Sequence, residues 1–290
     1  MKLIAASCAN LHHVNPQPVW FEIQREQPDV LLLLGDNIYL DHDRHSNPNK
    51  LREELQRLYA AQLAEPHFAA LLADLRTRHA TLLASYDDHD FLGNNRNGGD
   101  QDPELREAAR GEFIRAFAPL LTGTEIYRVM RSALADIVVL DERFYRRAVS
   151  DSKSDRDAIL GAAQWAWLEN IIATSTARFL ILGSSTPFHS FGDESWEQYP
   201  SAFERLRGHL RDRPGALIVS GDAHRNALYD DSGVIEILTS GVARRGLMYG
   251  SPRKNYGILI FTPEAVQVDL RSLKAGNRFE VTLAIAHWTL

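Results

Sequence analysis

PDVLLLLGDNIYLD, residues 28–41, is the stretch from which the rest of the chain can be interpreted. Five apolar residues, Val30–Leu34, run directly into Gly35 and Asp36, which predicts a strand that is buried on both faces. Gly35 lets the backbone turn sharply as it leaves the sheet. Asp36 and Tyr39 therefore fall at the carboxyl end of the strand, where open α/β sheets bind their ligands. A carboxylate beside a phenol suits a hard, highly charged cation.

Strands and helices alternate on both sides of this stretch. The first strand, a helix near residues 17–26 and the strand Val30–Leu34 predict a βαβ unit. Apolar runs predict further strands at Leu3–Ala6, Ala80–Ala84, Ile126–Met130, Ala135–Leu140, Phe179–Leu182, Ala216–Val219, Val234–Leu238, Tyr256–Phe261, Val266–Leu270 and Phe279–Ala286. Amphipathic periodicity predicts helices at Lys50–Leu63, Pro66–Leu75, Pro103–Ala118, Ala158–Ile172 and Ser201–Arg211. Polar segments at 41–49 and 91–103 are predicted loops. The interleaving indicates an α/β or mixed α+β class with a large core.

Composition is that of an ordinary globular protein. Of the 290 residues, 44% are hydrophobic and 24% charged, and we expect residues 1–290 to form a single catalytic domain. The net charge of −6 argues against a broad nucleic-acid-binding surface. The one cysteine, Cys8, excludes an internal disulfide. Because no apolar run has the length of a signal peptide or a membrane span, we expect a cytoplasmic protein without a membrane partner. Composition indicates no oligomeric state.

Polar groups recur where the apolar strands end. Five predicted strands end in a metal-capable residue or cluster: Cys8, Asp36, Asp87-Asp88-His89, Asp141, and Asp222 with His224. A single carboxylate at such a place is most often a helix cap or a turn residue. Carboxylates crowded at the ends of neighbouring strands would repel one another, and in proteins a bound polyvalent cation usually offsets this repulsion.

Three of these clusters carry a family resemblance. Gly35-Asp36-Asn37-Ile38-Tyr39, Asp87-Asp88-His89-Asp90 with Asn94-Asn95, and Gly221-Asp222-Ala223-His224 resemble motifs of the PhoD-like (alkaline phosphatase D) family of metallophosphoesterases. The resemblance extends in the family's order from about residue 5 to about residue 260. It implies a four-layer αββα sandwich with a metal centre at the strand ends.

The resemblance also implies which residues hold two metal ions. The implied ligands are Cys8, Asp36, Tyr39, Asp88, Asp222 and His224. Asp36 would bridge the two ions, and thiolate, phenolate and imidazole would complete a first site suited to Fe(III). Asp88 and Asp222 stand where related enzymes have Asn and His, so the second site has only oxygen ligands. Such a site favours Ca²⁺, Mg²⁺ or Mn²⁺ over Zn²⁺.

The implied activity is hydrolysis of a small phosphate ester, either a monoester or a diester. Two metal ions would activate water for in-line attack on phosphorus. His89 would act at the leaving oxygen as a general acid or a transition-state donor. Arg143 is the candidate phosphate clamp. Asn94 or Asn95 would orient the phosphate or bind the second metal ion.

Several assignments have alternatives. Asp87 could be the metal ligand in place of Asp88, or it could contact the ligands without binding the metal itself. Asp141 is expected to contact the ligands and not the metal. Arg143 could instead belong to an ion-pair network with Asp141, Glu142, Arg146 or Arg147. His189 follows a predicted strand end and is a weaker candidate ligand.

The function also has alternatives. One is a non-catalytic member of the fold that keeps its metal. Another is a nuclease or phospholipase type of diesterase, against which the negative net charge counts.

Overall fold

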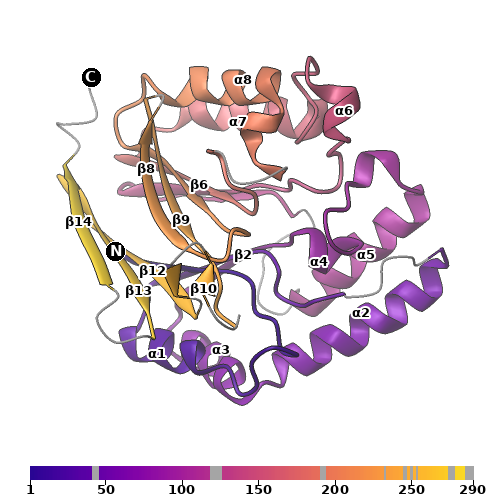
Figure 1. Cartoon of the computed structure of the whole chain (residues 1–290). Helices are drawn as coiled ribbons and strands as arrows, with labels where there is room; N and C mark the ends of the chain where they lie inside the picture. The colour runs from indigo at the N-terminus through magenta and orange to yellow at the C-terminus, as the bar shows by residue number, and fades with distance from the viewer. Residues whose placement is uncertain are drawn as a thin grey trace.

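Two mixed sheets form the centre of the protein (Figure 1). A computed structural model describes residues 1–40, 46–117, 126–189, 194–231, 233–243, 247–248, 251–252, 254–273 and 278–284. The first sheet has the order β14 (Arg278–Ala284), β13 (Ala265–Ser272), β12 (Asn255–Phe261), β1 (Lys2–Ala6), β2 (Val30–Leu34), β3 (Thr81–Ser85). The second has the order β4 (Arg128–Met130), β5 (Ala135–Val139), β6 (Phe179–Ser184), β7 (Ala216–Ser220), β9 (Val234–Thr239), β8 (Asn226–Asp231). Two short strands, β10 (Leu247–Met248) and β11 (Ser251–Pro252), pair separately.

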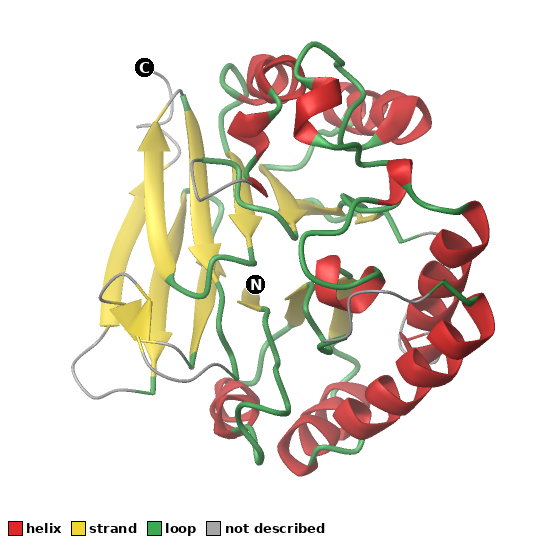
Figure 2. Cartoon of the chain, turned by 45° about the vertical axis from the view of Figure 1, so that its right-hand side comes forward, coloured by secondary structure: helices red, strands yellow, loops and turns green. Residues whose placement is uncertain are grey.

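Helices cover the two outer faces (Figures 1 and 2). The first sheet packs against α1 (Pro18–Glu26), α2 (Pro48–Leu63), α3 (Pro66–Thr77) and α5 (Pro103–Phe117) through one apolar core. The second packs against α7 (Gly161–Thr174) and α8 (Pro200–Leu210) through another. A third core fills the space between the sheets. The predicted four-layer αββα sandwich is confirmed.

Strand β2 shows why its sequence is apolar throughout. Leu31 and Leu33 point into the helical core, whereas Val30, Leu32 and Leu34 point into the core between the sheets. Successive side chains of a strand face opposite sides, so a strand between two cores needs apolar residues at every position. Each fully buried side chain of this size contributes about 1.5–3 kcal/mol. This burial holds the residues that follow β2 in a fixed place.

The parallel strands bring the strand-end residues to one edge. In the first sheet β1, β2 and β3 are parallel, with Ala6 opposite Leu33 and Leu34 opposite Ser85. In the second sheet β5, β6, β7 and β9 are parallel, with Ser184 opposite Ser220. The carboxyl ends of neighbouring strands are therefore level, and the loops that follow them lie together.

Two glycines allow these loops to approach closely. Gly35 has φ +83°, and a Cβ atom there would lie 2.4 Å from Cβ of Asp87. A Cβ atom on Gly221 would lie 2.6 Å from the carbonyl oxygen of Leu34, which belongs to the facing sheet. Any side chain at either place would push apart the strand ends that carry the acidic residues.

Some elements differ from the sequence prediction. Strand β8 was not predicted, because its sequence NALYDD is polar and it pairs as an antiparallel edge strand. Two one-turn helices, α4 (Asp88–Phe91) and α6 (Val149–Ser152), were also missed, and a 3₁₀ turn, η1 (Gly98–Asp100), lies in a predicted loop. Another 3₁₀ turn, η3 (Trp196–Gln198), precedes α8.

The observed helix boundaries differ from the predicted ones by a few residues. Helix α2 starts at Pro48, since Asn47 caps it by accepting from the N–H groups of Asn49 and Lys50. Helix α7 starts at Gly161 and not at residue 158. Residues 41–45 of one predicted loop, and Ala118 and residues 285–286 at the ends of a predicted helix and strand, lie outside the described residues.

Within the described part of the chain, every helix is too short or too polar to cross a membrane. The cytoplasmic location stays a prediction.

The close approach at Gly35 gives a stability test. We expect Gly35→Ala to lower the free energy of unfolding by about 1–3 kcal/mol, because the new methyl group meets Asp87 and φ is positive. Gly111→Ala in α5 is the control, since a Cβ atom at Gly111 would have no neighbouring atom within 4 Å. The control should raise stability by about 0.5–1 kcal/mol. Urea unfolding of both variants checks this, and equal effects would contradict the close-packing argument.

Candidate metal centre

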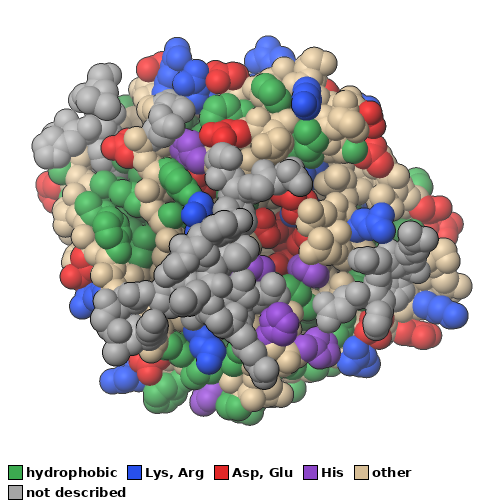
Figure 3. Space-filling model, in the orientation of Figure 1, with side chains coloured by type: hydrophobic (Ala, Val, Ile, Leu, Met, Phe, Trp, Pro, Cys, Tyr) green, Lys and Arg blue, Asp and Glu red, His purple; other side chains and the backbone are tan. Residues whose placement is uncertain are grey.

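Acidic side chains gather near the middle of one face of the protein, with histidines directly beside them (Figure 3). The backbone around them is unusual. Cys8, Asp36, Asp222 and His224 all have positive φ, between 52° and 62°. Such left-handed conformations are uncommon outside glycine and collect at functional sites. Four of the six predicted ligands, in the loops after β1, β2 and β7, therefore share this uncommon backbone conformation.

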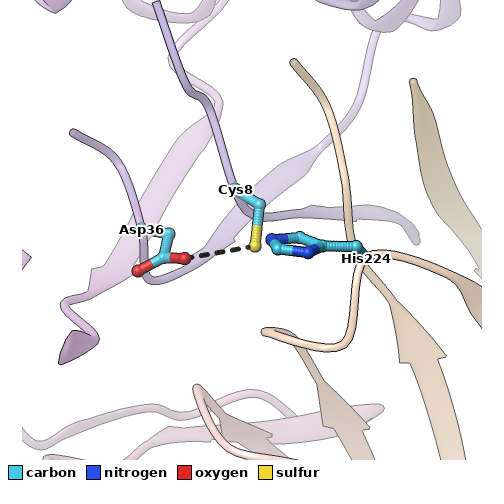
Figure 4. A group of neighbouring side chains, drawn as sticks. All are labelled: Cys8, Asp36 and His224. Carbon is cyan, nitrogen blue, oxygen red and sulfur yellow. Dashed lines mark hydrogen bonds between the residues drawn. The ribbon is translucent and has the colours of Figure 1, made fainter. Parts of the chain in front are cut away.

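The first group joins residues from both sheets. Cys8 follows β1, Asp36 follows β2 and His224 lies beyond β7, and one ligand atom of each lies within 4.8 Å of the others. Cys8 Sγ lies 3.4 Å from Asp36 Oδ2, as Figure 4 shows. The Tyr39 hydroxyl donates to Asp36 Oδ2 at 2.8 Å and lies 3.3 Å from His224 Nε2. The predicted thiol, carboxylate, phenol and imidazole thus meet at one point.

Asp36 also belongs to a second group. One ligand atom each of Asp36, Asp88 and His89 lies within the same 4.8 Å range, and Asp87, Asp88 and Asp222 form a third such group. Asp36 therefore lies between the thiol–imidazole group and the carboxylate group. This is the arrangement that a bridging ligand requires. Asp87 and Asp88 both belong to the carboxylate group, so both fit the position of a metal ligand.

Backbone N–H groups hold Asp88 in place. Its two carboxylate oxygens accept from the N–H of His89 at 2.8 Å and from the N–H of Asn95 at 2.7 Å. Asn95 has φ +57°, so it too has a left-handed backbone conformation. The side chains of Asn94 and Asn95 are exposed and bonded to each other at 2.9 Å. They lie beside Asp88, where a substrate can reach them.

The predicted acid His89 lies against Tyr39. The two ring centroids are 4.2 Å apart, and the imidazole is half-buried. In the described part of the chain, its Nδ1 has no hydrogen-bond partner. His89 thus belongs to the second metal-capable group, lies against Tyr39 beside the first, and has a ring nitrogen without a partner among the described residues.

Asp90, which belongs to the motif Asp87-Asp88-His89-Asp90 but was given no role from the sequence, joins the loops after β2 and β3. Its carboxylate accepts from the N–H groups of Asn37, Ile38 and Asp87 and from the Tyr59 hydroxyl. Asn37 and Ile38 lie between the ligands Asp36 and Tyr39. The buried Asp90 therefore positions the turn that carries both of them.

Arg143 is completely buried and paired with two carboxylates. Its Nε donates to Asp87 at 2.5 Å, and its two terminal nitrogens donate to Glu194 at 2.9 and 3.3 Å. The structure thus contains an ion-pair network at Arg143, but with partners other than those expected. The phosphate-clamp role stays a prediction, and the guanidinium would have to leave Glu194 to fulfil it. Glu194 lies shortly before η3, and no sequence pattern indicated it.

Burial and mutual repulsion act strongly on these acids. Burial raises the pKa of Asp36, Asp87 and Asp222 above the ordinary carboxyl value, and neighbouring carboxylates raise the pKa values of all three further. Burial and Asp222 also raise the pKa of Cys8 to about 11. Burial acts against ionisation of Asp88 too, but Arg143, His89 and the Asn95 N–H outweigh it and lower its pKa to about 2.

These observations fit a cation site. In the described part of the chain, Arg143 is the guanidinium that acts on Asp87, Asp88 and Asp222, and the neighbours that act on Asp36 are Cys8 and three carboxylates, so negative charge is in excess. Among the described residues, Asp87 Oδ2 is buried without a hydrogen-bond partner. A buried carboxylate oxygen of this kind is costly unless a cation contacts it. The thiol, phenol and imidazole on one side and the carboxylates on the other offer two chemically different sites.

The remaining sequence candidates lie outside the metal-capable groups. Asp141 accepts from the Tyr86 hydroxyl at 2.9 Å and supports the loop after β5. His189 Nδ1 is bonded to the buried Glu236 at 2.9 Å. Within the residues that the structure describes, neither is a member of a metal-capable group. Ser240 is an unpredicted neighbour, with its hydroxyl 3.1 Å from Cys8 Sγ.

The sequence model of the PhoD-like phosphatase family matches residues 3–256. The chain belongs to this family. It is similar to alkaline phosphatase D of Bacillus subtilis (strain 168), with 24% identity over 277 aligned residues, 77% of this chain and 46% of the relative. The chain thus spans about half the length of this PhoD-like relative.

Solved structures show the same fold. The structure of PhoD aligns with a TM-score of 0.73 and 19% identity, over 98% of this chain and 68% of that chain. A dimetal phosphatase from Danio rerio aligns with a TM-score of 0.61 and 12% identity, over 98% and 99% of the two chains. The PhoD-like chain therefore shares the sandwich with both.

The raised pKa values predict that the chelator-treated protein loses stability as the pH rises. A buried carboxyl group with a raised pKa still holds its proton at pH values where the unfolded state has already released it. The free energy of unfolding therefore falls as the pH rises above 3.8, the ordinary pKa of an aspartate side chain. Burial raises the pKa of Asp90 to about 7, which places the decline between pH 4 and 7. Asp88 titrates near 2, outside this window.

We expect a loss of about 2–4 kcal/mol over that window. Urea unfolding at a series of pH values, with chelator and after metal is restored, measures it. Metal-loaded protein should show a flatter profile, because cations replace the protons on Asp36 and Asp222, while the part of the decline that Asp90 causes should remain. A rise in stability between pH 4 and 7 without metal would contradict the assignment.

Proposed function

We propose that the protein is a metal-dependent phosphoester hydrolase with a binuclear centre. The observation that carries the proposal is the position of Asp36, whose carboxylate belongs to two groups of metal-capable side chains at once. Membership of the PhoD-like phosphatase family supports it, as do the names of the similar alkaline phosphatase D and dimetal phosphatase.

We assign Fe(III) to Cys8, Asp36, Tyr39 and His224. A thiolate and a phenolate are strong donors to ferric iron. Hydrogen bonds to Cys8 from Ser240, Ser7 and Tyr39 offset part of the rise in its pKa, and a bound cation would supply the rest of the stabilisation of the thiolate. We assign Ca²⁺, or Mg²⁺ or Mn²⁺, to the side with Asp88 and Asp222, where the donors are oxygens.

Bound cations would neutralise charge on the phosphoryl oxygens and lower the pKa of a bound water. The side chains around them supply the rest. Asn94 and Asn95 are exposed next to Asp88 and can donate to phosphoryl oxygens. His89 can give a proton to the departing alcohol oxygen as water attacks phosphorus from the opposite side. Arg143 holds Asp87 in place through its short contact, and its charge lowers the pKa of Asp87 against the larger effect of burial.

Replacing the bridging carboxylate tests the proposal. Asp36→Asn should lower phosphoester hydrolysis by at least about a hundredfold and reduce bound metal, because the amide cannot bridge two cations. Asp29→Asn, an exposed position before β2, is the control and should keep both. A panel of phosphate monoesters and diesters together with metal analysis provides the readout. Full turnover in Asp36→Asn would overturn the binuclear assignment, and bound metal without any turnover would favour the non-catalytic alternative.

The ligand set predicts colour. A Tyr39 phenolate and a Cys8 thiolate on Fe(III) should give a visible charge-transfer band, and Tyr39→Phe should remove the phenolate contribution to it. Absorption spectra and element-specific metal analysis of protein purified without chelators measure this. Tyr145→Phe is the control, because Tyr145 is an exposed tyrosine outside the ligand set. A colourless, active protein that contains only zinc would refute the ligand assignment.

A further inference from the structure

We propose that Ser240 is a positioning residue of the first metal site. Its hydroxyl donates a hydrogen bond to the Cys8 thiolate and so sets how much charge that sulfur gives to Fe(III). Ser240 directly follows β9 and is completely buried. The inference rests on the proposed hydrolase with its Fe(III) site, and it deepens that proposal by naming the group that controls the thiolate ligand.

Backbone hydrogen bonds hold the loop after β9 against the loop after β1. The N–H of Val242 donates to the carbonyl oxygen of Ser7 at 3.0 Å. The N–H of Ala243 donates to the carbonyl oxygen of Cys8 at 3.1 Å. Val242 and Ala243 are also buried in the apolar core between the first sheet and its helices. The position of Ser240 relative to Cys8 is therefore fixed by contacts that do not involve its own side chain.

The partners of the Ser240 hydroxyl determine where its proton points. Its Oγ accepts from the N–H of His224 at 3.0 Å and lies 3.1 Å from Cys8 Sγ. In the part of the chain that the structure describes, this sulfur is the acceptor within reach of the hydroxyl proton. A neutral Cys8 could itself donate, as it does to Asp36 Oδ2 at 3.4 Å. A thiolate bound to a cation has no proton, so Ser240 is the donor in the metal-loaded protein.

Two other hydroxyls near the sulfur are weaker donors. Ser7 Oγ lies 3.6 Å from Cys8 Sγ, and its proton is shared with the carbonyl oxygen of Thr239 at 3.4 Å. The phenol of Tyr39 loses its proton when it binds Fe(III) in the proposed way. Ser240 therefore remains as the short, undivided hydrogen bond to the thiolate.

A donor at this place changes the sulfur and holds a second ligand. A hydrogen bond withdraws electron density from a thiolate, and hydrogen bonds to ligating sulfurs are among the factors that set the potential of an iron centre. The cation then stays a stronger Lewis acid toward a phosphate ester. The same oxygen holds the backbone of His224, so Ser240 contacts one ligand beyond β7 of the second sheet and one after β1 of the first. Such contacts behind a metal ligand tune the metal and fix the ligand's orientation.

Two buried serines beside the sulfur provide a matched test. Ser240→Ala removes the hydroxyl at 3.1 Å, and Ser7→Ala removes the one at 3.6 Å. In iron-loaded protein, we expect Ser240→Ala to move the thiolate charge-transfer band to longer wavelength and the Fe(III)/Fe(II) potential to a more negative value, because the sulfur holds its electrons less tightly. Ser7→Ala should cause much smaller shifts. Absorption spectra and a redox titration measure both quantities, and thermal unfolding checks that both variants fold. Equal shifts in the two variants would overturn the proposal.

Deuterium separates the hydrogen bond from a purely structural effect. Resonance Raman spectra of the iron-loaded, unmodified protein in H₂O and in D₂O should differ in the iron–sulfur stretching band. Ser240→Ala should lose this difference and Ser7→Ala should keep it. An iron–sulfur band of the unmodified protein that does not respond to deuterium would overturn the role of Ser240, whether or not the variants fold.

The same spectra distinguish this inference from the proposed function. Iron-loaded protein without any thiolate band would overturn the proposed Fe(III) ligands and the role of Ser240 together. A deuterium shift that depends on Ser240, in a protein that hydrolyses no ester of the panel, would overturn the proposed function while supporting the role of Ser240.

Discussion

The crowding of buried carboxylates where two sheets meet is the constraint on which the rest of this structure depends. Asp36, Asp87, Asp88 and the half-buried Asp222 come from loops of both sheets, and Asp88 has a carboxylate oxygen within 4.8 Å of each of the other three. Burial raises the cost of each charge, and neighbouring charges add to it. The apolar cores between and outside the sheets supply the free energy that keeps these groups together.

The backbone around the acids carries strain for the same reason. Four strand-end residues adopt left-handed conformations, and Gly35 has no room for a side chain. Asp90 compensates by accepting several hydrogen bonds from the loops on either side, and Arg143 by pairing with Asp87 and Glu194. Strain at a site persists only where surrounding contacts hold it, and here these contacts are themselves buried and polar.

Sequence reasoning succeeded where local pattern and tertiary environment agree. The strand Val30–Leu34 was predicted as buried on both faces because each of its residues is apolar, and its side chains enter two different cores. It failed at β8, where a polar edge strand has no apolar pattern to reveal it. It gave no role to Asp90, although the quoted motif contains this residue, and it did not indicate Glu194. The reason is that a sequence does not show whether a carboxylate accepts internal hydrogen bonds or is exposed.

The sequence by itself determined that strands and helices alternate and which residues end the strands, since both follow from apolar runs of a few residues. The order of the layers came only from the family resemblance. The sequence also indicated the family and six candidate ligands. Only the tertiary structure decided which of them meet, because Cys8 and His224 are more than two hundred positions apart and belong to different sheets. It likewise decided that Arg143 faces Asp87 and Glu194, and that the hydroxyl of Ser240 lies beside the sulfur of Cys8. Distances between side chains depend on how the sheets pack, and no local pattern contains that information.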